Sequence, residues 1–561
     1  MSDAPSFDQA IAALTSAPGS PFELARREVD GVPMTVFANL PSSLREAFDG
    51  ARLHGDKTFL VYEDETWSFA QVLDRIGEIG DALVNQYGIE PGDRVAIAMR
   101  NYPEWIFSFA AIVSVGGIAV CMNAWWKEEE MAYGLEDSGA KLLIADLDRV
   151  RTAGAALSRL GVAATVVRHE GELPDGVDRL SEMLTSGAEL PDVDVLAEHD
   201  ATILYTSGTT GFPKGAVSSH YAVLSAFRAF ACRALVGAMM EPPKEPNPFD
   251  PCFILAVPLF HVTGLVPVML GCFLNGVKLV MMYKWTPERA LALIERERVT
   301  HFVGVPTMTI DLLESPDFAS RDTTSLGSVG GGGAPAPPEM VSRVDKSFAR
   351  ARPGLGYGMT ETNAYGPQNA GGDYLRKPRS SGRSVPILEV QCFDAEMNPV
   401  GIGEVGEICF RGPNLIRGYW NKPEATAETI IDGWLKSGDI GRIDEEGFVF
   451  VEDRAKDMVL RAGENIYCAE VEAVIYEFDA VHEAAVFGMP HERLGEEVAV
   501  AVMPKKGYLL DVGAMLAHTE ARLAKFKVPT LVEVCSEALP RNASGKILKK
   551  EIRETLVARR D

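Results

Sequence analysis

The sequence lacks the features that mark several classes of protein. Its eight cysteines are scattered and form no Cys-x-x-Cys pair, so no zinc site is indicated. The first residues do not combine a basic region with an apolar run, so we expect no secretory signal peptide there. Scattered thiols without a secretory leader favour reduced, buried cysteines. We therefore expect a cytoplasmic protein.

Positive charge is also in short supply. The chain has 54 Lys and Arg residues against 79 Asp and Glu residues, a formal net charge of −25. Such a charge repels the phosphate backbone of nucleic acids and anionic lipid. It still permits small anions to bind a local positive pocket. We expect small-molecule ligands and no nucleic-acid partner.

Long uncharged runs are few. Residues 105–126 and 251–277 carry no charge, and each is as long as the ~20 residues that a membrane span requires. The first contains Gly116 and Gly117 before a short apolar run, and the second contains Pro258 and Pro267. These interruptions indicate buried helices, turns and strands. We therefore expect no transmembrane segment.

The order of apolar patterns predicts an α/β fold with two domains. The 561 residues exceed one core of ~100–200 residues. Strands alternate with helical patterns from about 60 to 379, which predicts doubly wound parallel sheets. Short alternating runs over about 380–455 predict a small antiparallel β-barrel. We divide the chain into a large domain, 1–455, and a small, mobile C-terminal α+β domain, 456–561.

One short segment combines the groups that bind phosphate. Residues 205–215 read "YTSGTTGFPKG", with three glycines, four Ser or Thr residues and one lysine. It is not a Walker A loop, because Lys214 follows Pro213 and no hydroxyl follows the lysine. Glycine allows close backbone approach, and successive N–H groups can form an anion nest. A phosphate loop is our interpretation; the alternative is a solvated loop.

Five further segments accompany this loop along the chain. They read "GGGGAPAPPE", "GYGMTE", "GWLKSGDIG", "EDRAKDMVLRAGENIY" and "PRNASGKILKK". Together and in this order, the six motifs resemble those of the adenylate-forming superfamily, which includes acyl- and aryl-CoA synthetases. The resemblance covers essentially the whole chain. It implies ATP and CoA as co-substrates and Mg2+ as cofactor.

The resemblance also implies roles for individual residues. Lys546 is similar to the lysine that bridges the carboxylate and the α-phosphate, Glu361 to a magnesium ligand, and Thr360 to a contact of the α-phosphate. Thr206 is a second candidate for the metal. The implied ATP- and AMP-binding residues are Thr206, Ser207, Gly208, Thr209, Thr210, Lys214, Gly333, Ala334, Pro335, Tyr357, Gly358, Met359, Asp439 and Arg454. The simpler alternatives are a core tyrosine, a turn aspartate and a solvated lysine.

The resemblance places a hinge at Lys456, about which the small domain rotates between two half-reactions. The implied lining of the CoA tunnel is Arg461, Gly463, Glu464 and Asn465. Two positions depart from the family: Leu460 stands where several relatives carry lysine, and Cys468 stands where proline is usual. Both concern the thioester step.

The implied acyl pocket indicates the size of the acid. It comprises His261, Gly331, Gly332 and Gly358. Short-chain synthetases carry tryptophan where Gly358 stands, so a medium- or long-chain or aryl acid is expected. The "LFHVTG" stretch offers no acid for an amino-acid ammonium group. His261 either gates the pocket, orients the carboxylate or is a hydrogen-bonded core histidine.

The expected activity is that of an AMP-forming acyl-CoA synthetase. No carrier domain follows the lysine loop, so the acceptor is expected to be free CoA or a separate carrier protein. The alternatives are an acyl-AMP ligase that loads such a carrier and a non-catalytic nucleotide-binding protein. A homodimer is common among relatives, and the sequence does not decide it.

Overall fold

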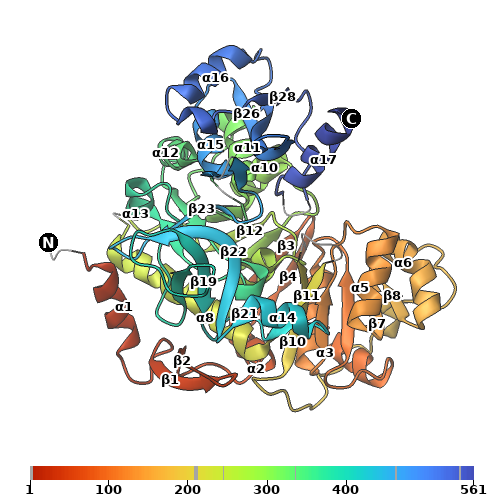
Figure 1. Ribbon diagram of the computed structural model, residues 1–561. Coiled ribbons are helices and arrows are strands. Elements are labelled where there is room, and N and C mark those ends of the chain that lie inside the picture. The colour runs from red at the N-terminus through yellow and green to blue at the C-terminus, as the bar shows by residue number, and fades with distance from the viewer. Residues whose placement is uncertain are drawn as a thin grey trace.

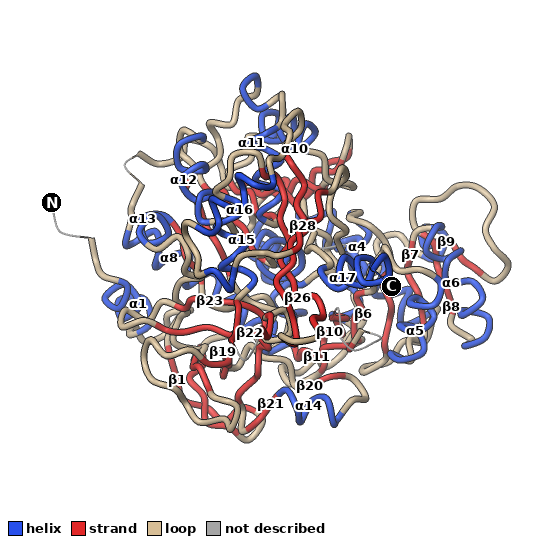
Figure 2. Tube along the Cα trace, turned by 45° about the horizontal axis from the view of Figure 1, so that its top comes forward, coloured by secondary structure: helices blue, strands red, loops and turns tan. Residues whose placement is uncertain are grey.

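The computed structural model describes residues 4–206, 213–243, 245–334, 336–461, 464–542 and 545–560. Two large sheets with their helices form the body of the molecule, and the C-terminal domain forms the top of the molecule in Figure 1. Figure 2 shows the same arrangement with this domain turned toward the viewer. This arrangement confirms the predicted α/β fold with parallel sheets and a C-terminal α+β domain.

The first large sheet is mostly parallel. Its order is β20-β11-β10-β6-β5-β7-β8-β9, and only β11 and β20 run antiparallel to their neighbours. The bounds are β5 (Arg94–Ala98), β6 (Ile118–Cys121), β7 (Leu142–Ala145), β8 (Ala163–Val166), β9 (Val177–Arg179), β10 (Asp200–Thr206), β11 (Lys214–Ser219) and β20 (Gly418–Tyr419). One face is covered by α5 (Glu128–Ser138) and α6 (Leu147–Leu160), the other by α3 (Phe69–Asn85) and α4 (Pro103–Ser114).

The second large sheet has the order β17-β16-β15-β14-β12-β13-β3-β4. The bounds are β3 (Thr58–Tyr62), β4 (Glu65–Ser68), β12 (Cys252–Leu255), β13 (Lys278–Met281), β14 (His301–Gly304), β15 (Ser328–Gly332), β16 (Arg352–Gly356) and β17 (Gln368–Ala370). One face is covered by α10 (Pro287–Glu297), α11 (Pro306–Glu314) and α12 (Pro338–Ser347). The helix α8 (His220–Met240) belongs to the core that both sheets share.

The region predicted to be a small antiparallel barrel is a five-stranded antiparallel sheet, paired in an open order. It comprises β18 (Glu389–Phe393), β19 (Gly406–Arg411), β21 (Ile430–Ile431), β22 (Trp434–Ile443) and β23 (Val449–Arg454). The remaining elements of the large domain are α1 (Phe7–Thr15), β1 (Leu24–Val29), β2 (Val32–Phe37), α2 (Leu44–Gly50), α7 (Leu180–Met183), α9 (Gly271–Leu274), α13 (Gly371–Arg376) and α14 (Pro423–Thr429).

The C-terminal domain has its own core on both faces of a sheet. Its elements are β24 (Val459–Arg461), β25 (Glu464–Ile466), α15 (Cys468–Tyr476), β26 (Val481–His491), β27 (Gly495–Pro504), α16 (Val512–Glu520), β28 (Leu531–Val534) and α17 (Lys549–Arg560). Alternate residues of β26 pack toward α15 and α16 on one side and toward α17 on the other. This two-sided burial accounts for the separate apolar pattern of this part of the sequence.

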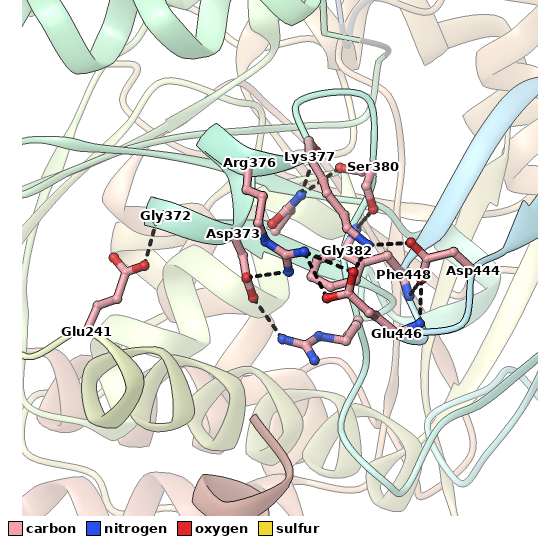
Figure 3. Close-up of polar contacts among 12 residues, drawn as sticks. Glu241, Gly372, Asp373, Arg376, Lys377, Ser380, Gly382, Asp444, Glu446 and Phe448 are labelled. Carbon is pink, nitrogen blue, oxygen red and sulfur yellow. Dashed lines mark hydrogen bonds and ion pairs between the residues drawn. The ribbon is translucent and has the colours of Figure 1, made fainter. Parts of the chain in front are cut away.

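A polar cluster joins the antiparallel sheet to the second large sheet (Figure 3). Lys377 lies 2.5 Å from Asp444 and 2.6 Å from Glu446, both in the turn between β22 and β23. Asp373 of α13 accepts from Arg383 at 2.8 Å. These contacts tie the turn between β22 and β23 to α13 and so hold the antiparallel sheet against the second large sheet.

The two uncharged runs belong to the core, as predicted. Residues 105–126 contain most of α4, the turn at Gly116 (φ +77°) and β6, and residues 251–277 contain β12, a π-helical segment Gly264–Leu270 and α9. In the described part of the chain, α8 has the length and apolar composition of a membrane-spanning helix, and half of its most apolar window is buried. Burial between two sheets accounts for that composition, since core helices are apolar all round.

Candidate active site

Three polar residues far apart in sequence meet where β16 ends. The Tyr357 hydroxyl, directly after β16, donates to Asp439 Oδ2 at 2.7 Å. Arg454 Nε lies 3.2 Å from Asp439 Oδ1, because β22 and β23 pair Asp439 with Arg454 in register. The strand pairing of the antiparallel sheet thus builds one side of the site and the parallel sheet supplies the other.

Asp439 keeps capacity for a further ligand. Its side chain is buried, and each carboxylate oxygen can accept a second hydrogen bond besides those to Tyr357 and Arg454. Burial raises the pKa of Tyr357, with the Asp439 charge as a smaller cause, so the phenol stays protonated and donates. A pair of ribose hydroxyls fits this carboxylate.

Glu361 is an interior carboxylate rather than a surface one. It lies in the short turn Thr360–Thr362, is 7% exposed, and its Oε1 accepts from the Tyr419 hydroxyl at 2.7 Å. Lys214 Nζ stacks 4.6 Å from the centre of the Tyr419 ring. Burial raises the pKa of Glu361, while the hydrogen bond from Tyr419 lowers it. A buried carboxylate of this kind is stabilised when a cation binds it.

The donor set fits Mg2+ bound together with a nucleotide. Among the described residues no group of three or more His, Cys, Asp or Glu side chains could hold a metal by itself. Mg2+ commonly binds one or two carboxylates and takes its other ligands from phosphate and water. Glu361 would supply that carboxylate and Thr206, at the end of β10, a hydroxyl.

The C-terminal domain brings Lys546 to the same corner. Burial lowers the pKa of Lys546 to about 8, and the neighbouring Arg454 adds to the lowering, whereas Asp457 and Asp439 oppose it. The backbone N–H of Lys546 donates to Asn542 Oδ1 at 2.9 Å, which shapes its loop. The positive charges of Lys546 and Arg454 are thus only partly compensated by the carboxylates around them. The site is therefore suited to receive an anion.

Gly358 is required by a close backbone approach. A β-carbon there would lie 2.3 Å from the Ala364 carbonyl oxygen. From the sequence we expected Gly358 to leave room in the acyl pocket. In the structure, the backbone of Ala364 occupies the place that a side chain at 358 would take. Met359, next in the chain, donates its N–H to Thr362 Oγ1 at 3.1 Å, which closes the same turn.

The glycines after β14 fall on two faces of the second sheet. Val303, Gly330 and Gly354 pair side by side on a face that is only partly buried, and Gly332 and Gly356 extend this face toward the site. Central strands are normally buried on both sides. Partial exposure with so few side chains leaves accessible space over this face.

Gly331 takes the opposite, buried face. A β-carbon there would lie 3.7 Å from Gly304 O and 3.8 Å from Pro306 Cγ. The accessible face therefore carries Gly330 and Gly332 rather than Gly331. The alternation of strand side chains explains the difference, and only the register of β15 reveals it.

His261 is half-buried beside Phe260, with the ring centres 4.8 Å apart. Burial lowers its pKa to about 4, so the imidazole is neutral at pH 7. Its Nε2 has no hydrogen-bond partner among the described residues. A buried ring nitrogen without a partner is costly, and a substrate group could satisfy it.

The other predicted residues lie in turns and hairpins that adjoin these strands, or outside the described part of the chain. Gly333 (φ +76°) and Ala334 directly follow β15. Lys456 lies in the turn after β23, and the β24–β25 hairpin pairs Arg461 with Glu464 beside an exposed Asn465. The residues that lie outside the described range are Ser207, Gly208, Thr209, Thr210, Pro335 and Gly463.

Two contacts at and beside the site were not predicted by the sequence analysis. Tyr419, which donates to Glu361, comes from β20, and β20 is placed by its pairing with β11 and by the bond from Ile416 N–H to Glu361 O, at 2.9 Å. Cys468 donates its backbone N–H to the buried Asp453 carboxylate, a bond that crosses the junction of the two domains. Neither contact follows from spacing along the chain. The proline-to-cysteine departure at 468 was the one visible hint.

Comparison with known proteins identifies the family. The AMP-binding enzyme model matches residues 48–420, and the AMP-binding enzyme C-terminal domain model matches residues 470–546. A feruloyl-CoA synthase of Amycolatopsis sp is 34% identical over 90% of this chain and 96% of its own. A long-chain-fatty-acid–CoA ligase of Bacillus subtilis (strain 168) is 31% identical over 90% of this chain and 93% of its own.

Solved structures agree. ATP-bound MatB from Rhodopseudomonas palustris superposes with a TM-score of 0.79 at 30% identity, covering 91% of this chain and 98% of its own. The anthranilate CoA ligase AuaEII with anthranoyl-AMP has a TM-score of 0.82 at 25% identity, covering 92% and 98%. The chain therefore belongs to the AMP-binding enzyme family, that is, to the adenylate-forming superfamily.

Proposed function

We propose that this protein, an AMP-forming acid–thiol ligase, activates a medium- or long-chain or aryl carboxylic acid. ATP and the acid give acyl-AMP and pyrophosphate, and CoA then takes the acyl group and releases AMP. The observation that carries the proposal is the corner where Asp439 binds Arg454 and Tyr357, with Lys546 of the small domain near enough for the charges of Arg454 and Asp439 to shift its pKa. Mg2+ would offset phosphate charge when bound beside Glu361.

The first half-reaction joins two anions, since a carboxylate attacks the α-phosphorus of ATP. Its transition state needs cationic groups placed before the reaction begins. Lys546 is largely protonated at pH 7, because its pKa is about 8. We assign to Lys546 the bridge between carboxylate and α-phosphate, and to Thr360 a contact of that phosphate. Asp439 would accept the ribose hydroxyls and Tyr357 would lie against the adenine.

The partly exposed glycine face supports a large acyl group. Gly330, Gly332, Gly354 and Gly356 add no side chain over the space above this face. The neutral His261 ring offers Nε2 to the substrate. Relatives named for a feruloyl group and for long-chain fatty acids are 34% and 31% identical, so similarity alone does not choose between aryl and alkyl acids.

For the second half-reaction we propose rotation about Lys456 of the domain 456–561 against 1–455. Rotation would withdraw Lys546 and bring the β24–β25 hairpin, with Arg461, Glu464 and Asn465, to the thiol of CoA. Leu460 of this hairpin is 53% exposed in the observed orientation. An exposed apolar side chain is consistent with a surface that is covered in a second orientation.

A cytoplasmic location and a homodimer complete the proposal. Among the described residues the cysteines are free, and all but Cys535 are buried, as expected under reducing conditions. Light scattering of the purified protein would test the dimer.

A panel of alkyl and aryl acids, assayed by pyrophosphate release, tests the function. We expect release that requires an acid, and AMP with thioester only when CoA is added. Acid-dependent exchange between ATP and pyrophosphate without any CoA turnover would instead favour a ligase that loads a separate carrier. If no acid gives exchange, the protein binds nucleotide without this chemistry.

A further inference from the structure

The C-terminal domain touches the large domain at both ends of α11. At the start of this helix, a β-carbon on Gly545 would lie 3.0 Å from Val305 Cγ2, so the loop that carries Lys546 is in contact there. At the end of the helix, Glu314 lies 3.2 Å from Nδ1 of His482, which belongs to β26. One helix thus supports the lysine loop and also pairs with a histidine of the same domain.

Glu314 also pairs with an arginine of its own domain. Its Oε1 lies 3.3 Å from Arg343 Nη2 of α12, and its Oε2 pairs with His482. The side chains of His482 and Glu314 are 23% and 31% exposed, so water screens the pair only in part. Partly buried charge pairs with one preplaced partner keep more of their attraction than exposed pairs.

The strand that carries His482 also anchors the lysine loop. Glu483, the next residue of β26, accepts from Leu539 N at 2.8 Å and from Arg541 Nη2 at 2.7 Å. Arg541 Nη1 in turn donates to Gly545 O at 2.6 Å, directly before Lys546. A displacement of His482 from the large domain is therefore transmitted to Lys546 through a short chain of hydrogen bonds.

We infer that His482 is a positioning residue for acyl-AMP formation, and that its pairing with Glu314 docks the C-terminal domain in the orientation that places Lys546 beside Asp439. The inference rests on the proposed role of Lys546. It assigns to His482 no contact with substrate.

The pairing depends on pH in one direction. The hydrogen bond to Glu314 raises the pKa of His482 above its usual 6.5, burial opposes the rise, and the charges of Glu314, Glu483 and Asp311 reinforce it. The pKa of Glu314 is lowered, chiefly by the hydrogen bond from His482 and also by Arg343, so this carboxylate stays ionised. The contribution of this pair to docking is therefore complete below about pH 6.5 and is lost as the pH rises through the raised pKa of His482.

The test compares His482→Gln and Glu314→Gln with His518→Gln. His518 is a matched control, because it pairs with Glu477 at 3.6 Å within its own domain. Acyl-AMP formation is followed as single-turnover pyrophosphate release between about pH 6 and pH 9. Thioester formation is measured separately, from supplied acyl-AMP and CoA.

We expect His482→Gln and Glu314→Gln to slow acyl-AMP formation about three- to fivefold near pH 6 and scarcely at all near pH 9. The thioester step should be unchanged, and His518→Gln should affect neither step. An equal deficit at every pH, or equal deficits in both steps, would overturn the inference.

A second measurement does not depend on activity. The NMR titration of His482, identified by the signal missing from His482→Gln, should give a pKa above 6.5 that falls in Glu314→Gln. An unchanged pKa in Glu314→Gln would rule out the contact. If the wild-type protein releases no pyrophosphate with any acid, the proposed function fails, while this titration still decides whether the two domains are paired here.

Discussion

At the scale of single residues, burial moves three ionisable groups of the site toward their neutral forms. It lowers the pKa of Lys546 to about 8 and that of His261 to about 4, and it raises the pKa of Glu361. Each shift has desolvation as its largest cause, and opposite charges offset the shift in part only at Lys546 and Glu361. Binding a polyanion with its cation would supply the missing charges, so the site is arranged for ligands that arrive together.

The first prediction concerns Lys546. Since its pKa is about 8, kcat/KM for acyl-AMP formation should fall as the pH rises through 8 and the free enzyme loses this charge. Lys546→Ala should lower the rate about 10²- to 10³-fold and spare thioester formation from supplied acyl-AMP. Pyrophosphate release across pH provides the measurement, and Lys550→Ala, an exposed lysine of the same segment, is the control.

Two outcomes would contradict this role. The alkaline decline should remain near pH 8 in His482→Gln, because that variant keeps Lys546. A decline that persists in Lys546→Ala, or a loss of both half-reactions in that variant, would show that the lysine acts elsewhere.

At the scale of elements, the register of β15 decides which glycines lie on the partly exposed face of the sheet, where we propose that the acyl group binds. The run of glycines at 330–333 was visible in the sequence, but its alternation between faces depends on pairing with β14 and β16. Those pairings join segments more than twenty residues apart, and no local pattern fixes them. The order of strands and helices could be predicted because hydrophobic periodicity is a local property of the sequence. The faces on which Gly330 and Gly331 lie could not be predicted, because they depend on pairing with distant strands.

The second prediction follows from these two faces. A β-carbon on Gly330 would meet its nearest neighbour, Phe302 O, at 3.7 Å, so Gly330→Ala fits the sheet and adds a methyl group above the accessible face. We expect the KM for the bulkiest accepted acid to rise about tenfold, because one methyl group in an apolar pocket changes selectivity by that order. The KM for ATP and the melting temperature should stay the same.

Gly331→Ala is the matched control on the same strand. Its β-carbon would also find ordinary contacts, at 3.7 Å or more, but on the buried face. It should leave the range of acids unchanged. If Gly331→Ala narrows that range and Gly330→Ala does not, the acyl group lies on the other side of the sheet.

At the scale of the whole molecule, the junction of the two domains contains a buried carboxylate held by backbone. Asp453 lies near the end of β23 in the large domain, and its carboxylate accepts the N–H groups of Arg454, at 2.8 Å, and of Cys468. Burial raises its pKa to about 6. The Cys468 thiol also lies 2.9 Å from Asp457 O, in the turn that contains Lys456. Proline, which the family resemblance leads one to expect at 468, has no N–H and could not donate this bond to Asp453.

The third prediction uses this difference. Cys468 is the first residue of α15, where proline is sterically accepted, so Cys468→Pro removes a donor without breaking the helix. Losing one N–H from a buried carboxylate should lower the free energy of unfolding by about 1–3 kcal/mol. The N–H stabilises the ionised form of Asp453, whose pKa is about 6. The loss should therefore be larger at pH 7.5 than at pH 5, where the carboxyl is mostly protonated. Urea unfolding at both pH values measures this loss.

Cys468→Ala is the control. It keeps the N–H, so its cost in the free energy of unfolding should be under about 1 kcal/mol and independent of pH. Equal losses in the alanine and proline variants would mean that the thiol, rather than the N–H, holds the junction.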